Sequence, residues 1–320
     1  MNYKVLQGDC IESLKTLDDE SVNCCVTSPP YWGLRDYGET DQLGLEETPE
    51  EYVANMVKVF SEVKRVLTKD GTLWLNLGDS YYNYRPGKGQ SLIKQTVSNT
   101  KQDLPVECSR RANKIQGLKE KDLVGIPWRV AFALQADGWY LRQDIIWHKP
   151  NPMPESVADR CTKAHEYIFL LSKSSKYYYD HEAVKEKCSE ANIEDFKRRK
   201  TLNNKGKGKG TYDEARPDLC RGRDAYMPDD FMRNKRSVWT VNTRPYPEAH
   251  FATYPKKLIR PCIKAGCPQG GVVLDPFGGS GTTAEVANEL QRDAILCELN
   301  PKYCELIEKR LSLTQFDMFP

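Results

Sequence analysis

Val272-Val273-Leu274-Asp275-Pro276-Phe277-Gly278-Gly279-Ser280-Gly281-Thr282 joins an apolar run, typical of a buried strand, to a glycine-rich turn and then to a helical pattern over residues 282–290. In sheets of parallel strands connected by helices, ligands bind beyond the carboxyl ends of the strands, where this turn falls. Its glycines let the backbone approach a ligand closely, and the free N–H groups of the following helix suit an anion. The spacing departs from GxGxxG, and no GK[ST] follows for a phosphate. The stretch therefore predicts a binding loop, of a kind that many nucleotide-binding sheets share.

The rest of the chain continues this alternation of strands and helices. Apolar or alternating runs predict strands at residues 4–7, 22–27, 72–77, 140–147, 167–171, 272–274 and 294–297. Helical spacing and end signals predict helices at 49–67, 127–138, 255–265, 282–290 and 301–311. The pattern indicates an α/β fold with a doubly wound, mainly parallel, seven-stranded sheet.

Composition limits the class of protein. A chain of 320 residues with 39% hydrophobic residues can bury a full core and still carry surface insertions. The start of the chain lacks an export pattern, and no run of about eighteen apolar residues is present, so we expect a cytoplasmic protein without a membrane span. The eleven cysteines show neither disulfide-scaffold nor paired zinc spacing; Cys262 and Cys267 could form half of a metal site, but we interpret them as core thiols and expect no metal.

A second loop follows another buried run near the start of the chain. Residues 22–27 lead directly into Ser28-Pro29-Pro30-Tyr31, which is either a plain turn or a functional loop. The predicted strand at 294–297 is followed by Glu298, an acid placed where it can hold two ribose hydroxyls, although it could also be a surface acid that caps a helix. Loops after parallel strands meet at one edge of a sheet, so these residues are candidates for one site.

The two loops resemble the motifs of the DNA amino-methyltransferases, [DNS]-Pro-Pro-[Tyr/Phe/Trp] for catalysis and Asp-Pro-Phe-x-Gly-x-Gly-Thr for the cofactor. Further matches are Gly8-Asp9, residues 70–76, Trp147-His148-Lys149-Pro150-Asn151 and residues 250–255. Of these, Lys149-Pro150-Asn151 would border the target-base pocket, or would simply be a rigid exit from a strand. The catalytic motif comes first, a recognition region next and the cofactor motif last, which is the circularly permuted order of the family's beta group. The resemblance implies a Rossmann-like class I methyltransferase fold with an inserted DNA-recognition region.

The resemblance also implies roles for the loops. Ser28 and the Pro29 carbonyl would accept hydrogen bonds from the target amino group, Pro29 and Pro30 would stiffen the loop, and Tyr31 would stack on an extruded base. The implied cofactor is S-adenosylmethionine. Asp9 would contact its adenine, although an acid after a short strand is also an ordinary turn residue. The implied cofactor-binding set is Asp9, Ala252, Asp275, Pro276, Phe277, Gly278, Gly279, Ser280, Gly281, Thr282 and Glu298.

Serine at the head of the catalytic motif is commoner among family members that methylate N4 of cytosine, and aspartate predominates in N6-adenine enzymes. Ser28 therefore favours N4-cytosine in duplex DNA, with N6-adenine as the alternative. Pro261-Cys262 lies in a predicted helix far from Ser28, which argues against the cysteine chemistry of carbon-5 methylation. More distant alternatives are a methyltransferase for RNA or a protein amide, a nicotinamide oxidoreductase, and a DNA-binding module with a degenerate site.

Positive charge is concentrated in two polar segments. Residues 85–121 hold nine basic and three acidic residues, and residues 185–236 hold fifteen and ten, within a chain whose net charge is only +2. Solvated loops are the alternative to a polyanion surface. We expect residues 1–180 to form the first part of the catalytic domain with an insertion at 85–121, residues 181–245 to form the target-recognition region, and residues 246–320 to complete the catalytic domain.

Within that recognition region, one basic run suits phosphates and three arginines suit guanine edges. The run is Lys197, Arg198, Arg199, Lys200, Lys205, Lys207 and Lys209, and the arginines are Arg221, Arg223 and Arg233. The expected partners are double-stranded DNA and a cognate restriction endonuclease that acts separately, and the expected state is a monomer or a homodimer.

Overall fold

The structure, a computed structural model, describes residues 2–34, 39, 42–82, 115–205, 231–243 and 254–316. Contacts divide the chain into two compact units. The larger combines Met1–Tyr179 with Ser237–Pro320, and the smaller is Asp180–Arg236. Within the described residues, no helix is both long and apolar enough to cross a membrane.

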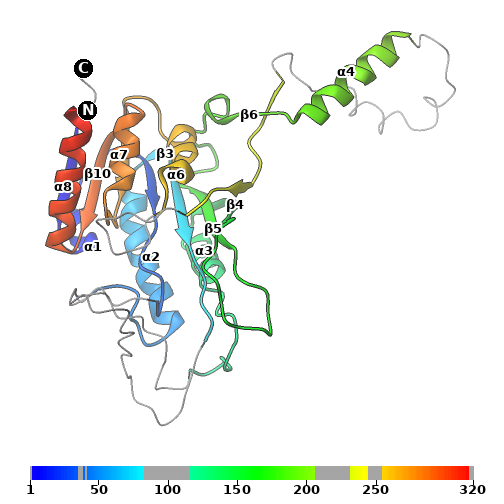
Figure 1. Cartoon of the computed structure of the whole chain (residues 1–320). Coiled ribbons are helices and arrows are strands. Elements are labelled where there is room, and N and C mark those ends of the chain that lie inside the picture. The colour runs from blue at the N-terminus through cyan, green and yellow to red at the C-terminus, as the bar shows by residue number, and fades with distance from the viewer. Residues whose placement is uncertain are drawn as a thin grey trace. The chain divides into compact units, whose positions relative to one another are not determined.

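A mixed sheet forms the centre of the larger unit (Figure 1), and its strand order is β1-β10-β9-β2-β3-β5-β4-β8. The strands are β1 (Tyr3–Gln7), β2 (Val22–Thr27), β3 (Leu67–Leu77), β4 (Tyr140–His148), β5 (His165–Ser172), β8 (Val238–Thr240), β9 (Val272–Asp275) and β10 (Asp293–Glu298). All neighbours from β1 to β3 pair in parallel, and β5 is antiparallel to both β3 and β4. The seven predicted strands are confirmed. The expected number was one short, because the three-residue β8 adds to β4 at the edge.

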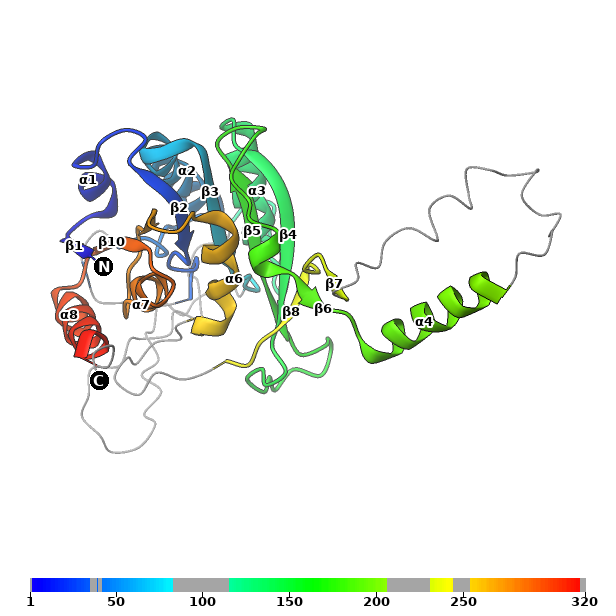
Figure 2. The ribbon, with the colours of Figure 1, turned by 90° about the horizontal axis from the view of Figure 1, so that it is seen from above.

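Helices cover both faces of the sheet (Figure 2). One face carries α1 (Cys10–Lys15), α2 (Pro49–Val66) and α3 (Ile126–Ala136), and the other carries α6 (Lys256–Gly266), α7 (Thr282–Glu289) and α8 (Pro301–Phe316). The doubly wound α/β prediction is therefore confirmed. Within each face, helices that follow one another in the sequence also touch in space, so each layer is continuous.

Helix α2 shows why the sequence folds this way locally. Its N-cap Thr48 accepts a hydrogen bond from the Glu51 N–H at 3.1 Å, and the Glu51 carboxylate accepts one from the Thr48 N–H at 3.2 Å. This reciprocal pair, with Pro49 in the first turn, fixes the start of the helix. From there Tyr52, Met56, Val59, Phe60 and Val63 form a fully buried stripe against the sheet.

The smaller unit contains one antiparallel pair of short strands and a long helix. The pair is β6 (Glu186–Lys187) with β7 (Met232–Arg233), a 3₁₀ turn spans Glu182–Val184, and α4 is Glu190–Lys205. Glu186 accepts hydrogen bonds from Arg233 at 3.0 Å and from Arg236 at 2.5 Å. These contacts hold the two ends of the unit together near its strand pair.

Candidate active site

The two predicted loops lie side by side although they are far apart in the sequence. Strands β2 and β9 are neighbours, with Cys24 opposite Val273 and Cys25 opposite Leu274. Because the strands are parallel, both loops leave from the same edge of the sheet. The Thr27 hydroxyl donates a hydrogen bond to Asp275 Oδ1 at 2.6 Å. This buried contact links the Ser-Pro-Pro-Tyr loop (residues 28–31) directly to the glycine loop (residues 275–282).

The Ser-Pro-Pro-Tyr loop is held from three sides. The Tyr31 hydroxyl donates to Glu166 Oε2 on β5 at 2.8 Å, and the Ser28 hydroxyl donates to the Tyr31 oxygen at 3.3 Å. The Tyr52 hydroxyl of α2 donates to the Pro30 carbonyl at 2.9 Å. The Tyr31 ring packs on Gly78, where an added Cβ would lie 2.4 Å from Tyr31 Cε2. These contacts fix the loop, and the Tyr31 ring lies against Gly78.

Behind Tyr31 lies a polar cluster in which Lys149 is the one residue that the sequence reasoning placed near the site. Glu166 forms an ion pair with Lys149, and their side chains are only 15% and 17% exposed. Asn76 on β3 donates through Nδ2 to Glu166 Oε2 at 3.3 Å, and the Lys149 ammonium lies 4.3 Å from the centre of the Trp147 ring. Burial raises the pKa of Tyr31 well above its usual value, and the negative charge of Glu166 adds to this, so the hydroxyl stays neutral. Lys149 was expected at the border of the target-base pocket, whereas no spacing singled out Glu166.

Asp275 faces into the protein and organises the glycine loop from inside. It is 1% exposed and accepts hydrogen bonds from Thr27, from the Phe277 N–H at 3.1 Å, from the Tyr254 hydroxyl at 2.8 Å and from the Thr283 hydroxyl at 2.5 Å. Burial raises its pKa to about 6 in spite of these donors, which lower it. The carboxylate predicted to touch the cofactor thus has its oxygens occupied by the protein and supports the loop.

Glu298 holds the glycine loop at the end of β10. Its Oε2 accepts from the Gly279 N–H at 2.8 Å and its Oε1 accepts from the Asn300 N–H at 2.9 Å. Burial raises the pKa of this half-buried carboxylate. Gly281 has φ of 78°, and a Cβ there would lie 3.2 Å from Ile307, so glycine is required on both counts. Helix α7 begins directly after it without a side-chain cap, which leaves a positive helix end at the loop.

Arg310 on α8 binds the same loop, although it is not part of the predicted sequence motif. Its Nη1 donates to the Ser280 carbonyl at 2.8 Å, to the Ser280 hydroxyl at 3.1 Å and to the Thr282 hydroxyl at 3.1 Å. Its Nη2 lies 2.5 Å from Glu285, and both side chains are less than 10% exposed. The last helix thus fixes the turn, a role that no local sequence signal revealed.

Asp9 comes to the same edge. Gln7 at the end of β1 lies opposite Glu298, and the Gly8 N–H donates to the Glu298 carbonyl at 2.9 Å. The Asp9 side chain is exposed and caps α1 by accepting from the Glu12 N–H at 3.0 Å. Asp9, Glu298 and the glycine loop are therefore assembled as expected. The predicted cofactor residue Ala252 lies outside the described residues.

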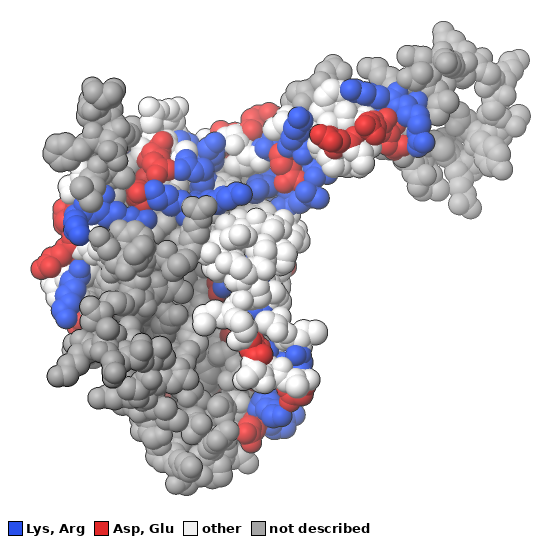
Figure 3. Space-filling model, viewed as in Figure 1, with Lys and Arg blue, Asp and Glu red and all other residues white. Residues whose placement is uncertain are grey.

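Of the predicted DNA contacts that the structure describes, Arg233 belongs to β7 and the others lie on α4. Lys197 and Arg198 are exposed there; Arg198 pairs with Asp195 at 2.8 Å, and the Lys197 ammonium lies 5.4 Å from the centre of the Phe231 ring. Figure 3 shows basic and acidic side chains along this helix. Arg199, Lys200 and Lys205 belong to the same helix, and Lys207, Lys209, Arg221 and Arg223 lie outside the described residues.

The expectation that Arg233 reads a guanine edge is not supported by its contacts. Its guanidinium is engaged by Glu186, which also binds Arg236. The charge of this arginine is therefore used to hold β6 and β7 together.

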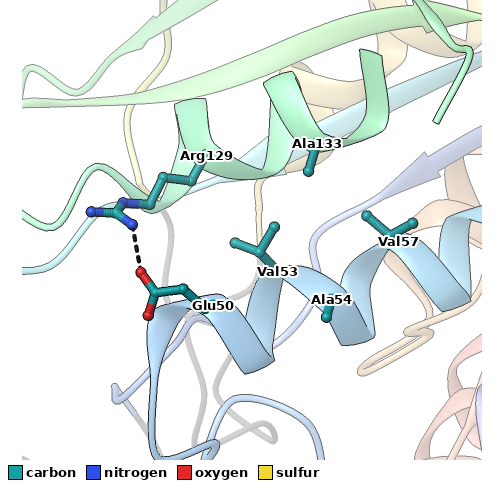
Figure 4. A pocket seen from close by; sticks show the side chains of 6 residues that line it. All are labelled: Glu50, Val53, Ala54, Val57, Arg129 and Ala133. Carbon is teal, nitrogen blue, oxygen red and sulfur yellow. Dashed lines mark hydrogen bonds and ion pairs between the residues drawn. The ribbon is translucent and has the colours of Figure 1, made fainter. Parts of the chain in front are cut away.

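A groove between α2 and α3 is lined by residues of these two helices and by none of either loop (Figure 4). Its rim carries an ion pair of 2.9 Å between Glu50 and Arg129, and its floor is aliphatic. The lining residues are Glu50, Val53, Ala54, Val57, Arg129 and Ala133. Apart from the ion pair, these six residues offer no nucleophile and no acid–base group.

Comparison with known proteins agrees with this arrangement. Residues 22–309 match the family model described as DNA methylase. The chain is 44% identical over 308 residues to the type II methyltransferase M.SmaI of Serratia marcescens, covering 96% of this chain and 90% of that protein. It is 45% identical over 307 residues to the type II methyltransferase M.Cfr9I of Citrobacter freundii, covering 96% and 87%.

Solved structures share the fold. The PvuII DNA methyltransferase, described as cytosine-N4-specific, superposes with a TM-score of 0.62 at 18% identity and covers 97% of this chain and 86% of its own. A putative DNA modification methylase of Thermus thermophilus, complexed with S-adenosyl-L-methionine, gives a TM-score of 0.55 at 22% identity, covering 97% and 94%. Taken with the sequence matches and the two linked loops, these findings show that the chain belongs to the DNA methylase family.

Proposed function

We propose that this protein is a type II DNA methyltransferase that transfers the methyl group of S-adenosylmethionine to N4 of a cytosine extruded from duplex DNA. The observation that carries the proposal is the placement of Ser28, at the head of a rigid loop tied to the glycine loop by the bond from Thr27 to Asp275. An acceptor for the target amine and a cofactor loop thus share one edge of the sheet.

The residues at this edge fit the cofactor. A Cβ added at Gly8 would meet nothing within 4 Å, so there is open space directly beside this residue. Each Glu298 oxygen holds one backbone N–H and retains a lone pair for a ribose hydroxyl. Asp9 would hold the adenine, and the uncapped start of α7 suits the carboxylate of the amino-acid part. When bound, S-adenosylmethionine supplies an electrophilic methyl group on a sulfonium.

The protein's own contribution is positioning. The exocyclic amine of cytosine is a poor nucleophile, because its lone pair is delocalised into the ring. Ser28 Oγ and the Pro29 carbonyl accept hydrogen bonds from this amine. The neighbouring Pro30 carbonyl already accepts a hydrogen bond from the Tyr52 hydroxyl. The Tyr31 ring lies against Gly78, which fixes its position, and the extruded base would stack on this ring. Holding the amine and the methyl group in line then lowers the barrier without a covalent enzyme intermediate.

Ser28 favours cytosine N4 over the runner-up, adenine N6. RNA and protein-amide substrates are less favoured, because α4 presents exposed Lys197 and Arg198 in a unit of its own, as expected for a DNA-recognition insertion. The names of the type II relatives suggest a role in restriction–modification, with a separate endonuclease that reads the same site.

The test is to incubate the purified protein with mixed-sequence duplex DNA and labelled S-adenosylmethionine, digest the DNA to nucleosides and identify the labelled species by mass spectrometry. We expect N4-methylcytosine from the wild type, none from Ser28→Ala, and normal yield from Ser21→Ala, a matched change at an exposed serine. N6-methyladenine would keep the family and contradict the inference from Ser28. No labelled nucleoside, with cofactor binding intact, would refute DNA as the substrate.

A further inference from the structure

Three side chains form a directed chain of hydrogen bonds that leads away from the proposed reaction centre. Glu166, when ionised, can only accept, so the Tyr31 hydroxyl donates to it at 2.8 Å. The Tyr31 oxygen can then accept the Ser28 proton across 3.3 Å. Ser28 Oγ, with its own proton committed, presents only lone pairs to an incoming amine.

Methyl transfer to an amine creates a proton that must leave. The nitrogen lone pair forms the new N–C bond, and the C–S bond breaks with its electron pair passing to sulfur, which becomes a neutral thioether. The positive charge now lies on the methylated base, which must lose one N–H proton to become neutral. A buried site therefore needs an outlet for this proton.

We propose that Glu166 is the final acceptor of this proton, which reaches it through Ser28 and Tyr31. The N4 proton passes to Ser28 Oγ as the Ser28 proton passes to Tyr31 Oη and the Tyr31 proton passes to Glu166 Oε2. The base loses one proton, Ser28 and Tyr31 are unchanged, and the carboxylate becomes a carboxylic acid that later releases the proton to water. This inference rests on the proposed amine methylation.

The surroundings of Glu166 suit this task. Lys149 binds Oε1, and this leaves Oε2 to face Tyr31 and Asn76. The ion pair places the positive charge of Lys149 beside the Glu166 carboxylate. The raised pKa of Tyr31 means that its hydroxyl holds a proton to pass on. The side chain of Glu166 is 15% exposed, which gives the proton a route to solvent after product release.

The decisive variant is Glu166→Gln. Glutamine keeps the shape and an oxygen that accepts from Tyr31, but it cannot take up the proton. We expect the single-turnover rate of DNA methylation to fall by on the order of 10²-fold, as for loss of a general base, with unchanged dissociation constants for S-adenosylmethionine and DNA. Formate added to Glu166→Ala should restore part of the rate. The matched control is Glu155→Gln, which removes the charge of a carboxylate paired with Arg160 and should leave the rate unchanged.

A Glu166→Gln protein that reacts at the wild-type rate would overturn the proposal, since hydrogen-bond acceptance alone would then suffice. Tyr31→Phe provides a second test if the first variant does not fold, because it keeps the ring and interrupts the chain. A similar loss of rate is expected, and a normal rate would refute the relay. Failure of the proposed function is a different result, namely a wild-type protein that methylates no DNA.

Discussion

Adding one methyl group at Gly78 should displace Tyr31 from its place. In Gly78→Ala the new Cβ would lie 2.4 Å from Cε2, 2.9 Å from Cδ2 and 3.2 Å from Cζ of the Tyr31 ring. Carbon atoms prefer separations of about 3.5–4.0 Å, so the ring must move by on the order of 1 Å. Gly78 does not have a positive φ, and alanine therefore suits its backbone.

The structure sets the size of the effect. Overpacking of this kind lowers the free energy of unfolding by about 1–3 kcal/mol. A shift of about 1 Å in a positioning group can cost on the order of 10²-fold in rate, and here it would also lengthen the hydrogen bond from Tyr31 to Glu166. We therefore expect a modest loss of stability and a large loss of single-turnover methylation, with cofactor affinity unchanged because the glycine loop is not touched.

The assay is a double-mutant cycle on the free energy of unfolding, measured by chemical denaturation, with Gly78→Ala and Tyr31→Ala made singly and together. Once the ring is removed, the added methyl group has room, so Gly78→Ala should cost little in the Tyr31→Ala background. An equal cost in both backgrounds would refute the reasoning, because the clash would then not involve the ring.

Three further predictions follow from the glycine loop and from α4. Replacing Arg310 by methionine removes three hydrogen bonds to Ser280 and Thr282, so the dissociation constant for S-adenosylmethionine should rise about tenfold or more, with DNA affinity unchanged, by titration calorimetry. The pKa of Asp275 is about 6 in the folded protein and has the ordinary value of 3.8 in the unfolded chain, so the folded protein binds this proton more tightly. The proton therefore adds up to about 3 kcal/mol to the free energy of unfolding. This contribution is complete below pH 3.8 and is lost as the pH rises through 6. Denaturation across this range should show the fall in the wild type and not in Asp275→Asn. Reversing the charges of residues 197–200 should weaken DNA binding and flatten its salt dependence without changing cofactor affinity, and unchanged DNA affinity would remove α4 from the interface.

Most of the sheet could be predicted, because its strands are buried apolar runs bounded by turns. Strand β3 begins at Leu67, earlier than the predicted 72, since polar residues at its start hide the pattern. The edge strand β8 has three residues, too few to show an alternation. Helix α1 is a short segment that the periodicity did not reveal.

The candidate site could be predicted where a motif is local and continuous. The loops at 28–31 and 275–282 carry their chemistry in consecutive residues, and the strand order brings them together. Glu166 and Arg310 reach those loops only through the folded chain, from positions whose local sequence has no distinctive spacing. Asp275 was found by its motif. Its inward orientation depends on hydrogen bonds from Tyr254 and Thr27, so the sequence of the loop alone does not predict it.

The strand order also determines the stage of synthesis at which the central sheet can close. Strand β1 pairs with β10, and β2 has β9 as one of its neighbours. These pairings of the first strands cannot form until the last strands have been synthesised. A nascent or prematurely terminated chain that lacks β9 and β10 has a Ser-Pro-Pro-Tyr loop without the glycine loop beside it. Such a chain cannot assemble the edge at which the two loops meet. That edge forms only after these long-range pairings, which are slow to form, have closed the sheet.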